Sequence, residues 1–264
     1  MPERDPSAEV ELALLVEAAE AAGKIALGFW RRDPKAWDKE DHSPVSEADL
    51  AVDAALKARL LAARPGYGWL SEESPDTPER LTAARVFVLD PIDGTRAFLA
   101  GEEAFAVSLA LVQDGRVIAG VVHLPAMGRS YTATAGGPAR RDGAVLAASA
   151  RSDLAGADIL ATRVTFEPQH WPGGLPQVKR SFRASLAWRL CLVAEGRFDA
   201  MVTLRGAREW DIAAGALIAE RAGAVVTDRQ GRPIAFSAPL PEAEGTVAAP
   251  PALHAALMAA LGRG

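Results

Sequence analysis

Apolar residues recur at helical spacing in two long segments near the start of the chain. In residues 8–32 they form a single stripe, which predicts an amphipathic helix that ends before Pro34. Residues 46–64 predict a second helix, because Ser46 is a typical N-cap and a Pro-Gly pair stops the run. The polar segment 35–44 between them has no period and is predicted to be a loop.

Shorter apolar runs in the next part of the chain predict strands. Residues 67–71 and 86–90 are predicted strands because continuous apolar runs of this length are typical of buried strands. Residues 105–112 and 117–124 flank Asp114-Gly115, and this pattern predicts a β-hairpin.

Helices and strands continue to interleave through the rest of the chain. We predict strands at 131–135, 159–162, 198–204, 224–227 and 246–248, helices at 185–195, 211–222 and 250–261, a glycine-rich turn region at 136–143 and a surface loop at 167–176. This alternation, with an antiparallel hairpin inside it, predicts a layered α/β fold. We expect an N-terminal α+β lobe over residues 1–150 and a C-terminal α/β lobe over 151–264, joined in one compact unit.

Composition limits the classes of function. The chain has 264 residues, of which 49% are hydrophobic, so it can bury a large core. A formal net charge of -5 argues against binding a nucleic-acid polymer, although local arginines still allow a small phosphorylated metabolite. The single Cys191 excludes an intrachain disulfide and is predicted to be buried. Without a signal pattern or a membrane-spanning run, we expect a cytoplasmic protein.

The segment Asp90-Pro91-Ile92-Asp93-Gly94-Thr95 carries the strongest chemical signal. Two carboxylates follow a predicted strand, and a Gly-Thr pair comes next. Carboxylates are suited to hard cations, and exposed amides at a turn into a helix are suited to phosphate, so the segment suggests metal-assisted phosphate chemistry. The alternative is a plain strand-to-helix turn, in which Thr95 caps the helix.

Three further acidic positions each have a structural and a functional interpretation. Glu72, in Glu72-Glu73 after a strand, is either part of a solvated turn or a metal ligand beside Asp90 at a shared sheet edge. Asp211 is either the N-cap of the helix that follows or a ligand. Asp49 is either the last residue of a capping box, Ser46-Glu47-Ala48-Asp49, or a carboxylate that polarises water.

Basic residues gather in the second half of the chain, but histidines show no metal-ligand spacing. The cluster between Lys179 and Arg189, with Arg205 and Arg208 later, is expected to be mostly solvated, while one or two members hold a second phosphate. No Walker loop, nucleophile elbow or dinucleotide fingerprint lies between a strand and a helix.

Together these segments resemble the inositol monophosphatase superfamily of magnesium-dependent, lithium-sensitive phosphatases. The resemblance rests on four segments in the family's order and spacing, which span roughly residues 10–236: Ser43-Pro44-Val45-Ser46-Glu47-Ala48-Asp49, Leu70-Ser71-Glu72-Glu73-Ser74, Asp90 to Thr95, and Trp210-Asp211-Ile212-Ala213-Ala214-Gly215. It implies an alternating α-β-α-β-α layered sandwich, like that of fructose-1,6-bisphosphatase.

The resemblance also implies the roles of individual residues. It implies that Mg²⁺ is bound by Glu72, Asp90, Asp93, Asp211 and the main-chain carbonyl of Ile92. It implies that Asp49 and Thr95 position or activate the attacking water, with Glu72 also serving catalysis. Substrate is expected to lie against Asp93, Gly94, Thr95 and Asp211.

The substrate is predicted from finer similarities. Leu70-Ser71-Glu72-Glu73 and the segment from Cys191 to Gly196 look like those of bacterial 3'(2'),5'-bisphosphate nucleotidases. The segment 184–187 departs from the family's usual Gly-Ser and leaves the substrate loop open for either substrate. Leu204 stands seven residues before Asp211, where inositol phosphatases carry an acidic residue, and this departure weakens an inositol assignment. We therefore expect hydrolysis of the 3'-phosphate of 3'-phosphoadenosine 5'-phosphate.

Several alternatives stay open at this point. Inositol 1-phosphate or another sugar phosphate is the rival substrate. Outside the enzyme class, the chain could be a phosphate-binding module without turnover or a structural metal protein. A homodimer is also left open, because nothing in the sequence fixes the oligomeric state.

Overall fold

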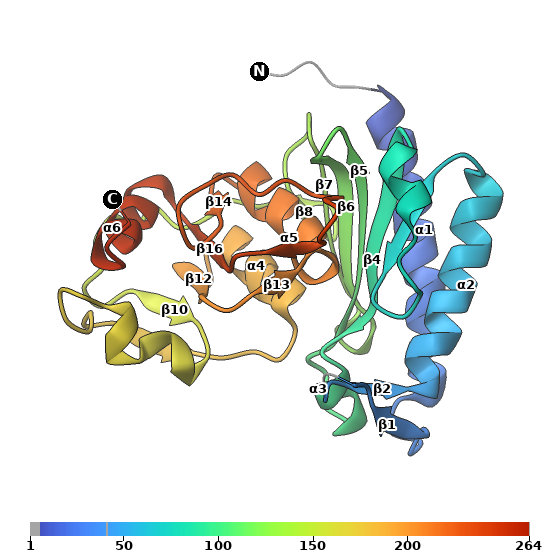
Figure 1. Cartoon of the computed structure of the whole chain (residues 1–264), viewed down its shortest axis with the longest axis horizontal. Helices are drawn as coiled ribbons and strands as arrows, with labels where there is room; N and C mark the ends of the chain where they lie inside the picture. Colours follow the sequence, from blue (N-terminus) through green and yellow to red (C-terminus); the bar gives the residue numbers. More distant parts are fainter. Residues whose placement is uncertain (1–5, 41, 264) are drawn as a thin grey trace.

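Helices and sheets alternate in five layers across the molecule (Figure 1). The structure is a computed structural model that describes residues 6–40 and 42–263. The first layer consists of α1 (Pro6–Phe29) and α2 (Glu47–Ala63), whose apolar faces cover one side of the large sheet. The predicted α-β-α-β-α sandwich is therefore confirmed.

The large sheet has seven strands in the order β3-β4-β5-β6-β7-β8-β9. Its strands are β3 (Gly68–Ser71), β4 (Arg85–Asp93), β5 (Ala106–Gln113), β6 (Arg116–Leu124), β7 (Arg129–Thr134), β8 (Arg140–Arg141) and β9 (Ala144–Val145). Only β3 and β4 run parallel, and every later pair is antiparallel. The predicted hairpin is confirmed as β5 and β6, with the Asp114-Gly115 turn in the left-handed region.

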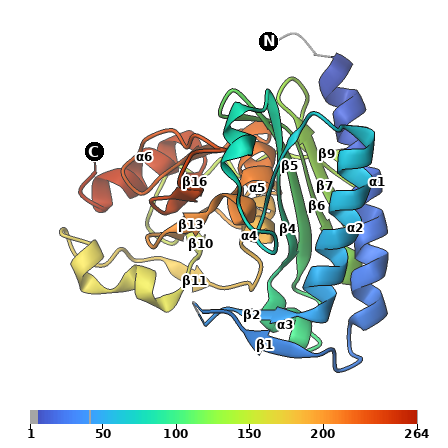
Figure 2. The same ribbon diagram turned by 45° about the vertical axis from the view of Figure 1, so that its right-hand side comes forward.

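The middle layer is formed by α4 (Leu186–Ala194) and α5 (Glu209–Arg221), which lie between the two sheets (Figure 2). Small residues let these elements approach closely. A Cβ atom on Gly120 of β6 would lie 3.1 Å from the Cα atom of Ala214, and one on Gly215 would lie 2.8 Å from the Cβ atom of Leu190. This tight packing fixes the start of α5 relative to the large sheet.

The second sheet has five strands in the order β11-β10-β12-β16-β14. Its strands are β10 (Asp158–Leu160), β11 (Lys179–Ser181), β12 (Ala200–Thr203), β14 (Val225–Thr227) and β16 (Thr246–Ala249). Its outer face packs against α6 (Pro251–Ala260), which completes the fifth layer.

Short elements connect these layers. They are β1 (Ala36–Asp38), β2 (Pro44–Ser46), α3 (Thr95–Leu99), β13 (Ala207–Arg208), β15 (Glu242–Ala243), and the 3-10 turns η1 (Pro78–Thr82), η2 (Pro125–Met127), η3 (Arg163–Phe166) and η4 (Pro168–His170). Strand β13 pairs with β15, and β1 pairs with β2.

Three sequence predictions are wrong in detail. The segment 167–176 is not a plain surface loop, because it contains η4 and the buried Trp171. Residues 35–44 are not a plain loop, because β1 lies within them and pairs antiparallel with β2, which begins at Pro44. Strand β4 does not end at Asp90 but runs on to Asp93, with an irregularity in its pairing between these two residues. A three-residue strand is too short to show an alternation of apolar and polar residues, and an irregularity in strand pairing leaves no sequence pattern.

Two broader expectations concern membrane-spanning helices and the division of the chain into lobes. In the described part of the chain, no helix combines the length and apolarity needed to cross a bilayer. The division into lobes at residue 150 stays a prediction. Helices α4 and α5 come from the second half of the chain, yet they share one core with the large sheet of the first half.

Candidate metal and phosphate site

Strands β3 and β4 bring the first two carboxylates together. The strands are parallel and pair Ser71 with Leu89, so the next residues, Glu72 and Asp90, lie side by side at the same end. The Glu72 amide extends the ladder by donating to the Leu89 carbonyl at 3.3 Å. This arrangement matches the sequence prediction that both side chains meet at one sheet edge.

The third carboxylate comes from α5, more than a hundred residues later in the chain. One carboxylate oxygen each of Glu72, Asp90 and Asp211 lies within 4.8 Å of the others. The Ser108 hydroxyl donates to the Trp210 carbonyl at 3.2 Å, which ties the start of α5 to the strand paired with Asp90. Carboxylate oxygens at this spacing are a donor set that fits a hard divalent cation.

The structural interpretation of Asp211 as an N-cap is wrong. Arg208 is the N-cap of α5, and Asp211 is the third residue of the helix. Asp211 makes no hydrogen bond or ion pair with any residue of the described ranges. A half-buried acid without a partner, beside other carboxylates, is stabilised by either a proton or a cation.

Burial and mutual repulsion raise the pKa values of the carboxylates in this cluster. Burial raises the pKa of Asp90 well above its usual range, and the charges of Glu72 and Asp93 raise it further. Burial likewise raises the pKa of Asp211 well above its usual range, with added repulsion from Asp93 and Glu72. The Asp90 carboxylate accepts one hydrogen bond, at 2.9 Å from the Ile92 amide, which is too little compensation for two neighbouring acids.

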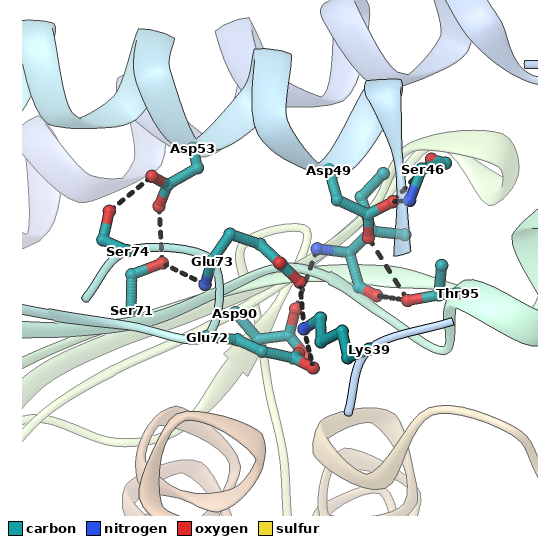
Figure 3. A network of polar contacts seen from close by, with 11 residues as sticks. Lys39, Ser46, Asp49, Asp53, Ser71, Glu72, Glu73, Ser74, Asp90 and Thr95 are labelled. Carbon is teal, nitrogen blue, oxygen red and sulfur yellow. Dashed lines mark hydrogen bonds and ion pairs between the residues drawn. The ribbon is translucent and has the colours of Figure 1, made fainter. Parts of the chain in front are cut away.

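Lys39 neutralises part of the cluster by pairing with Glu72 and with the neighbouring Glu73 (Figure 3). It comes from the β1–β2 hairpin, and its Nζ atom lies 2.8 Å from Glu72 Oε1 and 2.7 Å from Glu73 Oε1. Burial raises the pKa of Glu73 to about 7, against the opposing effect of the Lys39 hydrogen bond. The sequence analysis missed Lys39, because it lies in a segment predicted to have no structure.

Asp53 of α2 holds the turn that carries Glu72 and Glu73. Its Oδ1 atom accepts from the Ser71 hydroxyl at 2.5 Å, and its Oδ2 atom accepts from the Ser74 hydroxyl at 2.6 Å (Figure 3). The Ser71 hydroxyl in turn accepts from the Glu73 amide at 3.3 Å. The two serines that flank the Glu-Glu pair were the sequence signal for this anchor.

Asp49 and Thr95 lie together beside the acidic cluster. The capping box is confirmed, since Asp49 Oδ2 accepts from the Ser46 amide at 2.8 Å and from its hydroxyl at 2.5 Å. The other oxygen, Oδ1, lies 3.2 Å from Thr95 Oγ1, which is also 3.1 Å from the Ile92 carbonyl oxygen. Burial raises the pKa of Asp49 despite its bonds from Ser46. Asp49 therefore caps α2 with one oxygen and contacts Thr95 with the other, and its part in catalysis stays a prediction.

Gly94 allows the sharp turn between β4 and α3. Its φ is 101°, and a Cβ atom there would lie 2.9 Å from the Ala104 carbonyl oxygen, so only glycine fits. Gly94, not Thr95, is the N-cap of α3, so the prediction that Thr95 caps this helix is wrong. The Thr95 hydroxyl is instead directed to Asp49 and Ile92.

Asp93 is placed in the same cleft but is engaged differently. Its Oδ2 atom accepts from the Ser185 hydroxyl at 2.6 Å and from the Ala187 amide at 2.7 Å, and Oδ1 accepts from the Leu186 amide at 3.2 Å. Burial raises the pKa of Asp93 to about 6, while these bonds lower it. Asp93 thus anchors the start of α4, and its role as a metal ligand stays a prediction.

The acidic cluster lies at the floor of a cleft of about 540 Å³. Gly94, Thr95, Arg96, Arg189 and Arg205 also line this cleft, and a second hollow of about 530 Å³ shares Glu72, Arg205 and Asp211 with it. Arginines and carboxylates therefore line the same opening. Of the predicted basic residues between Lys179 and Arg189, only Arg189 lines the cleft, whereas the later Arg205 also lines it.

Known proteins identify the family to which this geometry belongs. Residues 8–263 match the model of the inositol monophosphatase family. The chain belongs to the inositol monophosphatase family. Members are metal-dependent phosphatases that act on small phosphorylated compounds, and the clustered carboxylates are in keeping with that chemistry.

Relatives with different substrates are similar to this chain to nearly the same degree. It is 32% identical to a histidinol-phosphatase of Chlorobaculum parvum over 96% of this chain and 97% of the relative. It is 31% identical to the 3'(2'),5'-bisphosphate nucleotidase CysQ of Aggregatibacter actinomycetemcomitans over 84% and 86%. It is 35% identical to an inositol-1-monophosphatase of Rhizobium meliloti over 71% and 73%.

A solved structure agrees on the fold. The extragenic suppressor protein suhB of Bartonella henselae superposes with a TM-score of 0.82 at 28% identity, covering 97% of this chain and 99% of the other. Family and fold together make this chain a phosphatase, and the substrate has to be argued from its own cleft.

Proposed function

We propose that this phosphatase is Mg²⁺-dependent and removes the 3'-phosphate of 3'-phosphoadenosine 5'-phosphate. The observation that carries the proposal is the cleft itself, which is lined by Glu72, Asp90 and Asp211 and also by Arg189 and Arg205. One phosphate would lie over the carboxylates with bound metal, and the second would meet the arginines. A substrate with two separated phosphates fits this division of charge.

Glu72, Asp90 and Asp211 are the residues proposed to hold magnesium, with Asp93 and the Ile92 carbonyl beside them. When bound, the metal supplies positive charge to the phosphate oxygens and lowers the pKa of water. The oxygen-only donor set favours magnesium over zinc, which prefers nitrogen and sulfur ligands.

Asp49 and Thr95 are proposed to handle the proton of the attacking water. Thr95 Oγ1 can accept a hydrogen bond from water while it donates its own proton to Asp49 Oδ1, 3.2 Å away. Burial raises the pKa of Asp49, which makes this carboxylate a better proton acceptor. Gly94 and Thr95 line the cleft from the turn into α3, where backbone amides can face the phosphate.

The arginines favour a second anion over the rival substrates. Arg205 makes no hydrogen bond or ion pair within the described ranges, so its charge is available to a ligand. Leu204, at the position where inositol phosphatases carry an acid, packs against the outer core and does not line the cleft. Histidinol phosphate carries an ammonium group, which these arginines would repel.

Phosphate release with three substrates tests the proposal. With Mg²⁺, we expect the highest kcat/KM for 3'-phosphoadenosine 5'-phosphate, lower values for inositol 1-phosphate and histidinol phosphate, and no activity in EDTA. Asp90→Asn should abolish release from all three while the fold is kept. Faster turnover of inositol 1-phosphate would refute the nucleotide assignment, and an Asp90→Asn enzyme that stays active would refute the metal site.

A further inference from the structure

Phe182 is an unusual residue for the wall of a polar cleft. It follows the edge strand β11 and is 48% exposed, although it lines the same cleft as Asp90, Asp211 and Arg189. A single exposed aromatic residue is ordinary on a protein surface. Its place inside the substrate cleft, beside a buried arginine, requires a separate explanation.

Arg189 holds Phe182 in place from one side. The guanidinium carbon lies 4.5 Å from the centre of the Phe182 ring, which is a cation–π contact. The same guanidinium donates from Nε to the Arg183 carbonyl at 2.5 Å and from Nη2 to the Ala184 carbonyl at 3.3 Å. Arg189 is only 5% exposed, so both the ring and the segment that carries it rest on a fixed support.

We propose that Phe182 is a stacking platform for a planar aromatic group of the substrate. A ring that is supported by Arg189 and still half exposed can take an aromatic heterocycle with little loss of conformational freedom. Base–aromatic stacking is tolerant of the identity of the heterocycle because each has a π face. The inference rests on the proposed function, in which adenine is that group, and it makes Phe182 a specificity-determining residue.

The test separates the heterocycle from the phosphates. The first substrate is 3'-phosphoadenosine 5'-phosphate, and the second is 1-deoxyribose 3,5-bisphosphate, which keeps both phosphates and lacks the base. For Phe182→Leu we expect kcat/KM to fall about tenfold with the nucleotide, mainly through KM, and less than about twofold with the abasic compound. Phe182→Trp, which keeps a planar face, should retain the preference for the nucleotide.

A matched control is available on the surface. Leu175 is also 48% exposed and does not line the cleft, so Leu175→Ala should leave both substrates unaffected. Equal losses on the two substrates for Phe182→Leu, in an enzyme that still prefers bisphosphates, would overturn the stacking role while leaving the proposed function in place.

Histidinol phosphate distinguishes the two sources of an aromatic group. If the wild type prefers histidinol phosphate and Phe182→Leu loses that preference, the platform stands and the nucleotide assignment falls. If the wild type prefers inositol 1-phosphate and Phe182→Leu changes nothing, both the platform and the nucleotide assignment are refuted.

Discussion

Glu209 and Asp211 lie two residues apart at the start of α5, yet their surroundings are opposite. Glu209 is 1% exposed, and both of its oxygens are used: Oε2 accepts from the Ser237 amide at 2.6 Å and Oε1 from the Ala238 amide at 3.0 Å. Asp211 has no such partner in the part of the chain that the structure describes and faces two other carboxylates. The protein satisfies the first acid, and we propose that a cation satisfies the second.

Arg80 completes the satisfied environment. It donates to the Ala238 carbonyl at 2.8 Å and to the Ser237 hydroxyl at 3.2 Å, and it pairs with Asp76 at 2.5 Å. The loop that caps Glu209 is thus held by a cation from η1. The comparison teaches that burial alone does not mark a functional acid, because the hydrogen bonds around it decide its role.

The largest expected effect is on Asp211. Asp211→Asn should lower Mg²⁺-dependent phosphate release about 100-fold or more, because one of three clustered ligands loses its charge. Without magnesium, its Tm should equal or exceed that of the wild type, since a repelled carboxylate is removed. Phosphate release and thermal unfolding measure the two effects. A variant that stays active, or that loses stability without metal, would contradict the metal-ligand assignment.

A smaller effect on activity, with a clear loss of stability, is expected for Glu209→Gln. The amide NH₂ would face one of the two backbone amides that now donate to Glu209, and that buried clash should cost about 1–3 kcal/mol. Chemical denaturation measures the loss, and activity should fall less than about tenfold. If this variant instead keeps its stability and loses its magnesium response, Glu209 belongs to the metal site and the contrast with Asp211 fails.

The smallest effect concerns pH. Burial raises the pKa of Asp93 to about 6 from an ordinary 3.8, so between these values the folded chain binds more protons than the unfolded chain. Without magnesium, the free energy of unfolding should therefore fall as the pH rises from about 4 to about 6.

Magnesium should reverse this trend, because it binds the deprotonated carboxylates of Asp90 and Asp211. We expect the rise in Tm on adding Mg²⁺ to be a few degrees larger at pH 7.5 than at pH 5, at about 2–4 °C for each kcal/mol. Thermal unfolding with and without Mg²⁺ at both values checks this. An equal rise at both values would show that protons and magnesium do not compete for this cluster.

Much of the site could be predicted because its residues lie in local patterns. Glu72 and Asp90 each follow an apolar run, so the parallel pairing of β3 with β4 was enough to place them together. The capping box at Ser46 and the hairpin around Asp114-Gly115 are likewise decided by neighbouring residues. Lys39, Asp53 and Glu209 could not be found in this way, because their partners lie 18 or more residues away or in segments without a pattern.

The sequence by itself determined the alternation of helices and strands, the two acidic segments at strand ends and the family resemblance. The helices and strands follow from the short-range periodicity of apolar residues, and the acidic segments are recognised because carboxylates directly follow apolar runs. Only the tertiary structure decided that Asp211 lacks a partner while Glu209 has two, that Asp93 anchors α4, and that Arg189 supports Phe182 in the cleft. The physical reason is that solvation and hydrogen bonding of a side chain are set by whatever the fold brings against it.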